Sequence, residues 1–118
     1  MELAKKAGAV GAAVALAFGM SVLVAAPQAN AASCPDNGWS IKDGRIGQYF
    51  SGNGINIRTG PGTGCTAVGQ GQASHSVQLD CWKPGDGGTW SHLFDFTTNR
   101  QGWVKDSLLV GNGANVRC

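Results

Sequence analysis

The chain has 118 residues, of which 19 are glycine, nine are basic and seven are acidic. This length suits one domain. From residue 32 onward, seven basic residues stand against six aspartates, a net charge of +1. So small a charge excludes the electrostatic footprint of a domain that binds nucleic acid or an anionic membrane.

The first 31 residues have the pattern of a secretory signal peptide. Lys5 and Lys6 form a positive start, and residues 7–26 are an almost unbroken apolar run. Ala29 and Ala31 then supply the small residues of a cleavage site. We therefore predict cleavage after Ala31 and a secreted domain, extracellular or associated with the cell wall, that has no membrane contact after cleavage.

Two alternatives to this cleavage are open. The apolar run is just long enough to span a bilayer, so it could remain as an anchor. A lipid could also be attached at Cys34, which follows small residues. Lipidation would leave three other cysteines, an odd number for an oxidising compartment.

The four cysteines of residues 32–118 predict two disulfides, because their number is even and the chain is expected to be secreted. A domain this small buries too little surface to be stable without such help. No C-x-x-C pair is present, which argues against a zinc site, and we expect no metal or other cofactor. The cysteines are Cys34, Cys65, Cys81 and Cys118.

Residues 32–118 show short β-type runs separated by Gly, Asn, Asp and Pro, and no helical period. This pattern predicts one small all-β domain. An irregular leader at 33–44 comes first, and a tail at 110–118 comes last. The predicted strands are residues 46–50, 55–58, 66–70, 76–82, 89–96 and 102–105, with a loop at 83–88 and one 3₁₀ turn at 106–109.

Three motifs follow one another in the predicted strands. Residues 56–63 read N-I-R-T-G-P-G-T, residues 89–90 read T-W, and residues 101–104 read Q-G-W-V before a Leu-Leu pair. In this order they resemble the bacterial SH3-like domain (the SH3b family) over about residues 46–110. The resemblance implies a small, strongly bent β-barrel of about five strands, with Trp90 and Trp103 in its core. It also implies a non-catalytic module that often binds peptidoglycan or its peptide bridges.

The Gly-Pro-Gly-Thr stretch at residues 60–63 could be a structural corner or a phosphate cradle. The resemblance implies a corner, in which Pro61 fixes its own φ and the flanking glycines accept unusual angles. A cradle would need a third glycine where Cys65 stands, or a Gly-Lys-Ser/Thr sequence, and a following helix. We therefore predict a corner.

No catalytic constellation is evident after residue 31. Glutamate is absent from this part of the chain, and aspartates in predicted turns usually cap the local backbone. We expect His75 in an exposed hairpin loop and His92 on the outer face of a strand, with Ser91 on the opposite face. We predict that the protein is not an enzyme. The turn aspartates are Asp36, Asp43, Asp86 and Asp106.

Aromatic side chains are the better candidates for a ligand surface. If Leu79 and Cys81 point inward, strand alternation turns Trp82 outward, and it turns Tyr49 away from Phe50. Exposed aromatics near Asn, Gln and Ser suit the binding of sugars or glycine-rich peptides. The candidate ligand-binding residues are Tyr49, Trp82, Trp39 and His92.

These features predict a monomeric, secreted binding module that recognises cell-wall peptidoglycan or its peptide bridges. The alternative is a secreted protein–protein interaction factor, an inhibitor or antagonist, built on the same small barrel and acting on another secreted protein. Wall binding would separate the two.

The resemblance also bears on the disulfides. Cys65 and Cys81 flank a predicted hairpin, so we expect them to pair, with a bulge near Val68. An SH3-like barrel brings its terminal strands together, so we expect Cys34 to pair with Cys118.

Overall fold

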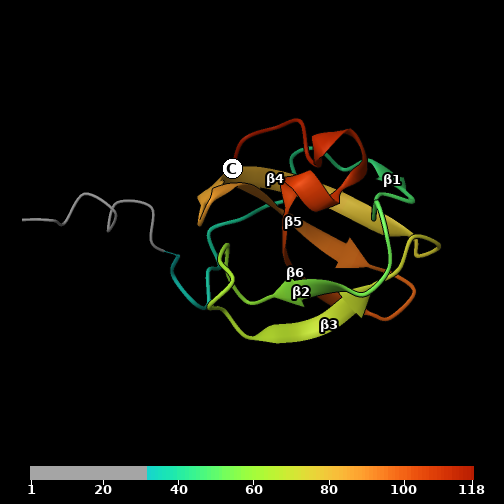
Figure 1. Cartoon of the computed structure of the whole chain (residues 1–118). Coiled ribbons are helices and arrows are strands. Elements are labelled where there is room, and N and C mark those ends of the chain that lie inside the picture. Colours follow the sequence, from blue (N-terminus) through green and yellow to red (C-terminus); the bar gives the residue numbers. More distant parts are fainter. Residues whose placement is uncertain (1–31) are drawn as a thin grey trace, which may run out of the picture.

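The computed structural model describes residues 32–118 as one curled antiparallel β-sheet (Figure 1). The predicted signal peptide, residues 1–31, lies outside the described residues. Within residues 32–118 no helix is long and apolar enough to cross a membrane.

The sheet has six strands in the spatial order β1-β4-β5-β6-β2-β3. Two 3₁₀ turns, η3 and η4, follow the last strand. The predicted all-β class and the 3₁₀ turn directly after Lys105 are both confirmed. The elements are β1 (Ile46–Gly47), β2 (Ile55–Arg58), β3 (Ala67–Gly71), β4 (Val77–Gly85), β5 (Gly88–Asp95), β6 (Arg100–Lys105), η3 (Asp106–Leu108) and η4 (Val110–Asn112).

Two predicted elements differ from the structure. The strand expected at 46–50 shortens to β1, and Phe50 forms only an isolated bridge to Leu109. The loop expected at 83–88 is mostly strand, because Asp86 and Gly87 form a two-residue hairpin turn between β4 and β5. Gly87 has a positive φ of 71°, which glycine adopts without strain.

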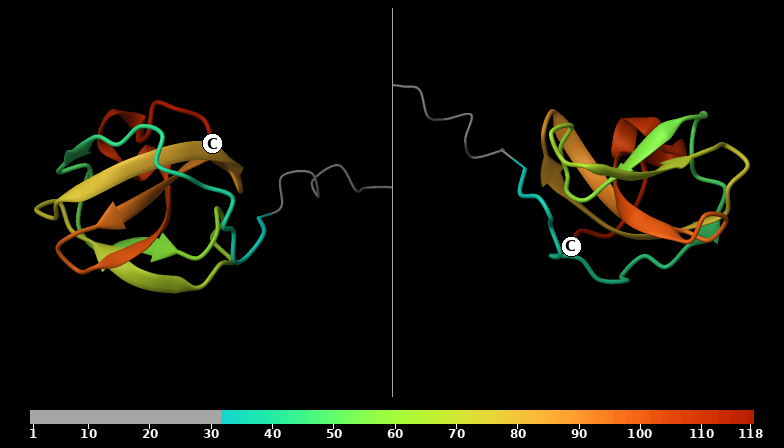
Figure 2. Two further views of the ribbon diagram at one scale, coloured as in Figure 1. Left: turned by 180° about the vertical axis from the view of Figure 1, so that it is seen from behind. Right: turned by 90° about the horizontal axis from the view of Figure 1, so that it is seen from below.

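The leader and the tail cover the outer edge of β4 (Figure 2). The backbone amides of Lys42 and Asp43 donate to the carbonyl of Asp80. Further along the strand, the amide of Trp82 donates to the carbonyl of Val116. An uncovered strand edge is an open template for pairing with other chains, so these two segments complete the sheet.

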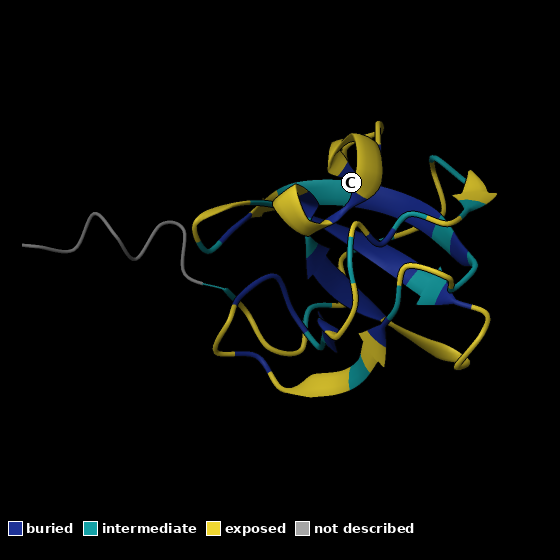
Figure 3. Cartoon of the chain, turned by 45° about the vertical axis from the view of Figure 1, so that its right-hand side comes forward, coloured by how far each residue is buried: buried dark blue, intermediate teal, exposed yellow. Residues whose placement is uncertain are grey.

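Buried side chains follow the inner strands, whereas exposed residues gather in the loops and at the edges (Figure 3). Trp90 and Trp103 are buried, as predicted. Tyr49 and Trp82 are half-buried and pack against the main apolar cluster. That cluster consists of Phe50, Ile55, Ile57, Val77, Leu79, Leu93, Val104, Leu109 and Ala114.

The expected number of disulfides, two, is confirmed, but the predicted pairing is wrong. Cys34 is bonded to Cys65, and Cys81 to Cys118. The reason is topological: β3 pairs with β2 at one edge of the sheet and β4 pairs with β5, so no hairpin joins Cys65 to Cys81. One bridge ties the leader to the corner before β3, and the other ties the tail to β4.

The bulge expected at Val68 is present. Ile57 pairs with Gly69 and Arg58 with Ala67, so the ladder between β2 and β3 passes over Val68. The corner at residues 60–65 closes on itself: the amides of Gly62 and Cys65 donate to carbonyls within it. Two of its backbone donors are therefore used inside the corner, which agrees with a structural corner.

Candidate functional site

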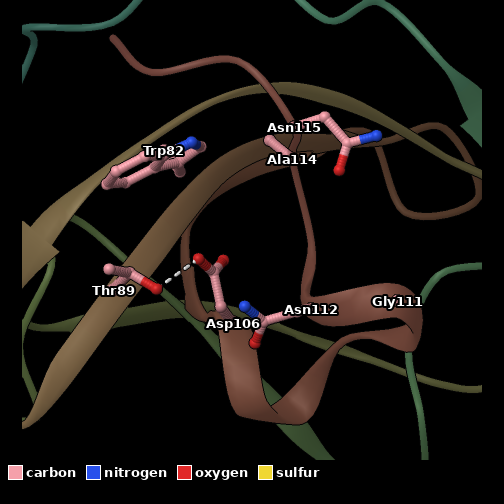
Figure 4. A pocket seen from close by; sticks show the side chains of 7 residues that line it. All are labelled: Trp82, Thr89, Asp106, Gly111, Asn112, Ala114 and Asn115. Carbon is pink, nitrogen blue, oxygen red and sulfur yellow. Dashed lines mark hydrogen bonds between the residues drawn. The ribbon is translucent and has the colours of Figure 1, made fainter.

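The tail arches over β4 and β5 and encloses a hollow of about 320 Å³, which we call the tail hollow (Figure 4). Trp82 of β4 and Thr89 of β5 line one side of it, and Asp106 of η3 lines the floor. The other side is tail, with Ala114 among its residues. Three elements far apart in sequence therefore meet around one space.

Hydrogen bonds and a disulfide hold the tail in this arch. The amide of Trp82 donates to Val116, the amide of Cys118 donates back to Trp82, and Cys118 is bonded to Cys81. The ammonium of Lys42 donates to the carbonyl of Cys118 at 3.0 Å. The end of the chain is thus fixed along β4.

Asp43 and Arg45 hold the middle of the tail. The carboxylate of Asp43 accepts two hydrogen bonds from the guanidinium of Arg45, at 2.7 and 2.8 Å, and one from the amide of Asn115 at 2.7 Å. Arg45 also donates to the carbonyl of Gly113. The hydrogen bonds from Arg45, helped by the Asn115 amide, lower the pKa of Asp43 to about 2, although burial opposes them.

The floor of the hollow is a buried carboxylate with two hydroxyl partners. Thr89 donates to Asp106 at 2.7 Å, and Ser91 donates to its other oxygen. The Ser91 hydroxyl accepts in turn from the amide of Ala114 at 2.9 Å. Burial raises the pKa of Asp106, and the two hydroxyls offset this rise in part.

Gly113 allows the backbone of the tail to pass close to this floor. Its φ is 77° and its ψ is −146°, a conformation that is essentially restricted to glycine. A Cβ at this position would stand about 2.5 Å from an oxygen of Asp106 and 2.6 Å from the hydroxyl of Ser91. The glycine therefore lets the tail approach the buried hydroxyls closely.

Three polar groups at the tail hollow have no partner among residues 32–118. They are the indole N–H of Trp82 and the side-chain amides of Asn112 and Asn115. Arg117 lies over the indole, with its guanidinium carbon 5.1 Å from the ring centroid. In Figure 4 the Asn112 amide lies beside Asp106, whereas the Asn115 amide stands at the rim and points outward. A half-buried ring beside unused donors and acceptors can bind a polar ligand with one flat apolar face.

The structure places His92 differently from the expectation. It is buried, only 3% exposed, and its Nδ1 lies 2.7 Å from the carboxylate of Asp80. Trp39 of the leader stacks on the imidazole, with ring centroids 3.7 Å apart. The prediction of an exposed His92 is wrong, because Trp39 of the leader covers this imidazole.

His75 lies in the loop between β3 and β4, as expected, but its side chain is only 12% exposed. Its Nδ1 lies 2.7 Å from the carboxylate of Asp95, which is fully buried in β5. Each imidazole of the described chain thus has one buried aspartate as its partner. Neither pair is among the residues that line the tail hollow.

The four predicted ligand-binding residues fall into separate places. Trp82 lines the tail hollow, whereas Trp39 and His92 pack together on the other side of β4 and β5. Tyr49 lies beneath the guanidinium of Arg45, 5.4 Å from its ring centroid. Arg45 also donates a hydrogen bond to the carbonyl of Gly113, so Tyr49 contacts the tail only indirectly, through Arg45. A role for these four residues in binding stays a prediction.

Sequence reasoning did not single out Asn112 and Asn115, and it treated Asp106 only as a capping residue. Their common signal is local: the tail reads V-G-N-G-A-N-V, with two amides among small residues. Nothing in that pattern shows that the tail folds back on Trp82. For His92, the sequence does contain a signal, the Asp86-Gly87 turn. A two-residue turn at this point pairs Cys81 with His92 and places Asp80 beside the imidazole.

Residues 32–118 contain no group of three or more His, Cys, Asp or Glu side chains that could hold a metal ion. Comparison of the chain with protein-family models, with curated proteins and with solved structures found no match.

Proposed function

We propose that residues 32–118 form a secreted, non-catalytic binding module of the bacterial cell envelope. Its ligand is a sugar or a peptide bridge of peptidoglycan, bound at the tail hollow. The observation that carries this proposal is the half-buried indole of Trp82 beside two unpaired side-chain amides, those of Asn112 and Asn115. The resemblance of residues 46–110 to SH3b domains supports the choice of a cell-wall ligand.

The chemistry around the hollow favours binding over hydrolysis. Asp106 is the only ionisable side chain among its lining residues, so the hollow lacks the two carboxylates of most glycoside hydrolases. All four cysteines of the described chain are in disulfides, which removes a thiol nucleophile. Two disulfides also fit an oxidising compartment.

Sedimentation with purified, insoluble peptidoglycan tests the proposal. Trp82 packs against the core, so its removal would also disturb folding, and the two amides are the better targets. Asn112 has a positive φ of 63°, so Asn112→Gly removes the amide without straining the backbone. Combined with Asn115→Ala, it should lower the bound fraction about tenfold, the loss expected for two or three hydrogen bonds.

Ser107→Ala is the matched control, because Ser107 is exposed on η3 and lies outside the hollow. It should bind wall as the wild type does, and thermal unfolding should confirm that all variants are folded. Equal sedimentation of the amide variant and the wild type would refute the site. If the wild type itself does not sediment, the wall ligand is wrong, and the secreted interaction factor is the reading to test.

A further inference from the structure

A second hollow, of about 340 Å³, lies across β2 and the end of β6. Its apolar part is formed by Ile55, Trp90 and Leu108, of which the first two belong to the buried residues of the sheet. Its polar part includes Arg58 of β2, Lys105 of β6 and Thr63 of the corner. We call this space the cationic hollow.

Both charged residues of the cationic hollow are positive, and neither has an ion pair among residues 32–118. Arg58 donates one hydrogen bond, to the carbonyl of Cys65 at 2.9 Å, which leaves other guanidinium N–H groups unused. The ammonium of Lys105 has no hydrogen-bond partner among the described residues. Two cations from neighbouring strands therefore share one hollow without a carboxylate between them.

The carboxylates of the described chain are mostly engaged elsewhere. Four of them each lie within hydrogen-bonding distance of a basic or imidazole side chain. Asp106 accepts hydrogen bonds from two hydroxyl groups. Asp86 is the remaining one, and its side chain lies against Gly62 of the corner rather than in an ion pair with Arg58 or Lys105. The four pairs are Asp36–Lys83, Asp43–Arg45, Asp80–His92 and Asp95–His75.

We propose that the cationic hollow binds a carboxylate carried on a small apolar group. Arg58 and Lys105 would donate charge-assisted hydrogen bonds to the carboxylate, which are stronger than those between neutral groups. The Thr63 hydroxyl adds a donor at the rim. The apolar floor of Ile55, Trp90 and Leu108 takes the alkyl part, which a bare inorganic anion does not have.

This assignment gives the Gly-Pro-Gly-Thr corner a part in binding without making it a phosphate cradle. Two backbone amides of the corner, those of Gly62 and Cys65, donate within the corner itself. The anion would instead be held by side chains, and the corner would only place Thr63 at the rim. The site is independent of the wall-binding proposal, since it needs neither Trp82 nor the tail.

Two sources present this chemistry, the C-terminus of a peptide and a free organic acid. Titration of the ¹⁵N-labelled, disulfide-intact protein can separate them with three probes: N-acetyl-alanyl-alanine, the same dipeptide with a C-terminal amide, and propionate. We expect the dipeptide acid to shift the amide signals of Arg58, Thr63 and Lys105. It should bind about tenfold or more tightly than the amide, and more weakly as salt is raised.

Equal affinity of propionate and the dipeptide acid would assign the site to free organic acids, and tighter binding of the dipeptide would assign it to a peptide terminus. Lys105→Gln should weaken binding of the acid about tenfold, whereas Lys105→Arg should retain it. Arg100→Gln removes one positive charge elsewhere on the exposed surface and is the matched control. The proposal is overturned if the amide binds as well as the acid, if the acid causes no shift at the hollow, or if Lys105→Gln behaves like Arg100→Gln.

Discussion

The strands β2 to β6 and the two terminal segments of this domain are stabilised in different ways. The strands share ladder hydrogen bonds and bury the apolar cluster that includes Ile57, Leu79 and Leu93. The leader and the tail contribute few apolar contacts to that cluster, of which Ala114 is one. Disulfides, backbone hydrogen bonds and the Asp43–Arg45 pair hold them instead.

This difference determines which lining residues of the tail hollow are held firmly in position and which are not. Trp82, Thr89 and Ser91 belong to the strands, so their positions follow from the sheet. Asn112 and Asn115 belong to the tail, so their positions depend on a small number of specific bonds. Changes that release the tail should therefore affect binding more than they affect the sheet.

The largest effect is expected from removing the disulfides. The two bridges close loops of 31 and 37 residues, so each should contribute about 4 kcal/mol to the free energy of unfolding by loop entropy. Replacing Cys81 and Cys118 together by Ala should also free the tail. We expect hydrogen exchange at Ala114 and Val116 to accelerate, and binding at the tail hollow to be lost.

Replacing Cys34 and Cys65 together by Ala is the control for this prediction. It should destabilise the domain by a similar amount, yet leave the exchange protection of Ala114 close to that of the wild type when both are measured under folding conditions. Equal loss of tail protection in the two variants would show that the leader and the tail are not held independently.

A second comparison uses two glycines of the tail. Gly113→Ala should cost about 3 kcal/mol, because it strains a glycine-restricted conformation and places a Cβ against Asp106 and Ser91. Gly111 also has a positive φ, 64°, but no heavy atom lies within 4 Å of its Cβ position, so Gly111→Ala should cost only about 1 kcal/mol. Urea unfolding of both variants measures the difference, and equal costs would contradict the close approach over the floor.

The Asp43–Arg45 pair should make stability depend on pH in the acid range. The pKa of Asp43 is lowered from its ordinary value of 3.8 to about 2, so its contribution is present above pH 4 and lost as the pH falls to 2. The side chain of Arg45 is 41% exposed, which reduces the contribution to about 1 kcal/mol. Asp43→Asn should therefore be less stable near neutral pH and should lose less stability than the wild type between pH 4 and 2.

Asp106 should change the pH dependence of stability in the opposite direction to Asp43, and we expect this to be the smallest of the effects. Burial raises its pKa above 3.8, so its contribution is fully present below that value and is lost as the pH rises through the raised pKa. A ¹³C titration of the Asp106 carboxyl group should show a midpoint above 3.8. A midpoint at or below the ordinary value would show that the hydroxyls of Thr89 and Ser91 outweigh burial.

Most of the strands could be predicted from the sequence, because their alternation and turn residues are local. The motif around Asn56 to Thr63 placed β2 and the corner correctly, and the Trp90 and Trp103 motifs placed β5 and β6. The disulfide pairing could not be predicted in the same way, because it depends on the order of strands in the sheet. A hairpin between Cys65 and Cys81 was as consistent with the local pattern as the observed arrangement.

The candidate site was harder to predict than the fold for a physical reason. Alternation predicts an outward-facing Trp82, whereas the side chain is half-buried against the apolar cluster, and alternation carries no information on what covers it. The tail that covers it has almost no β pattern. Its path is determined by hydrogen bonds that its amides donate to Asp43 and Ser91 and by the one that its carbonyl accepts from Trp82. The burial of His92 was missed because local alternation does not show that Trp39 of the leader packs on this side chain.

The most direct test of the tail hollow is an NMR titration of the ¹⁵N-labelled protein with soluble peptidoglycan fragments. The indole N–H of Trp82 and the side-chain amides of Asn112 and Asn115 each give a separate signal. We predict that all three shift together and saturate at the same fragment concentration. If they stay unchanged while other signals shift, or if no signal shifts at all, the tail hollow is not the binding site.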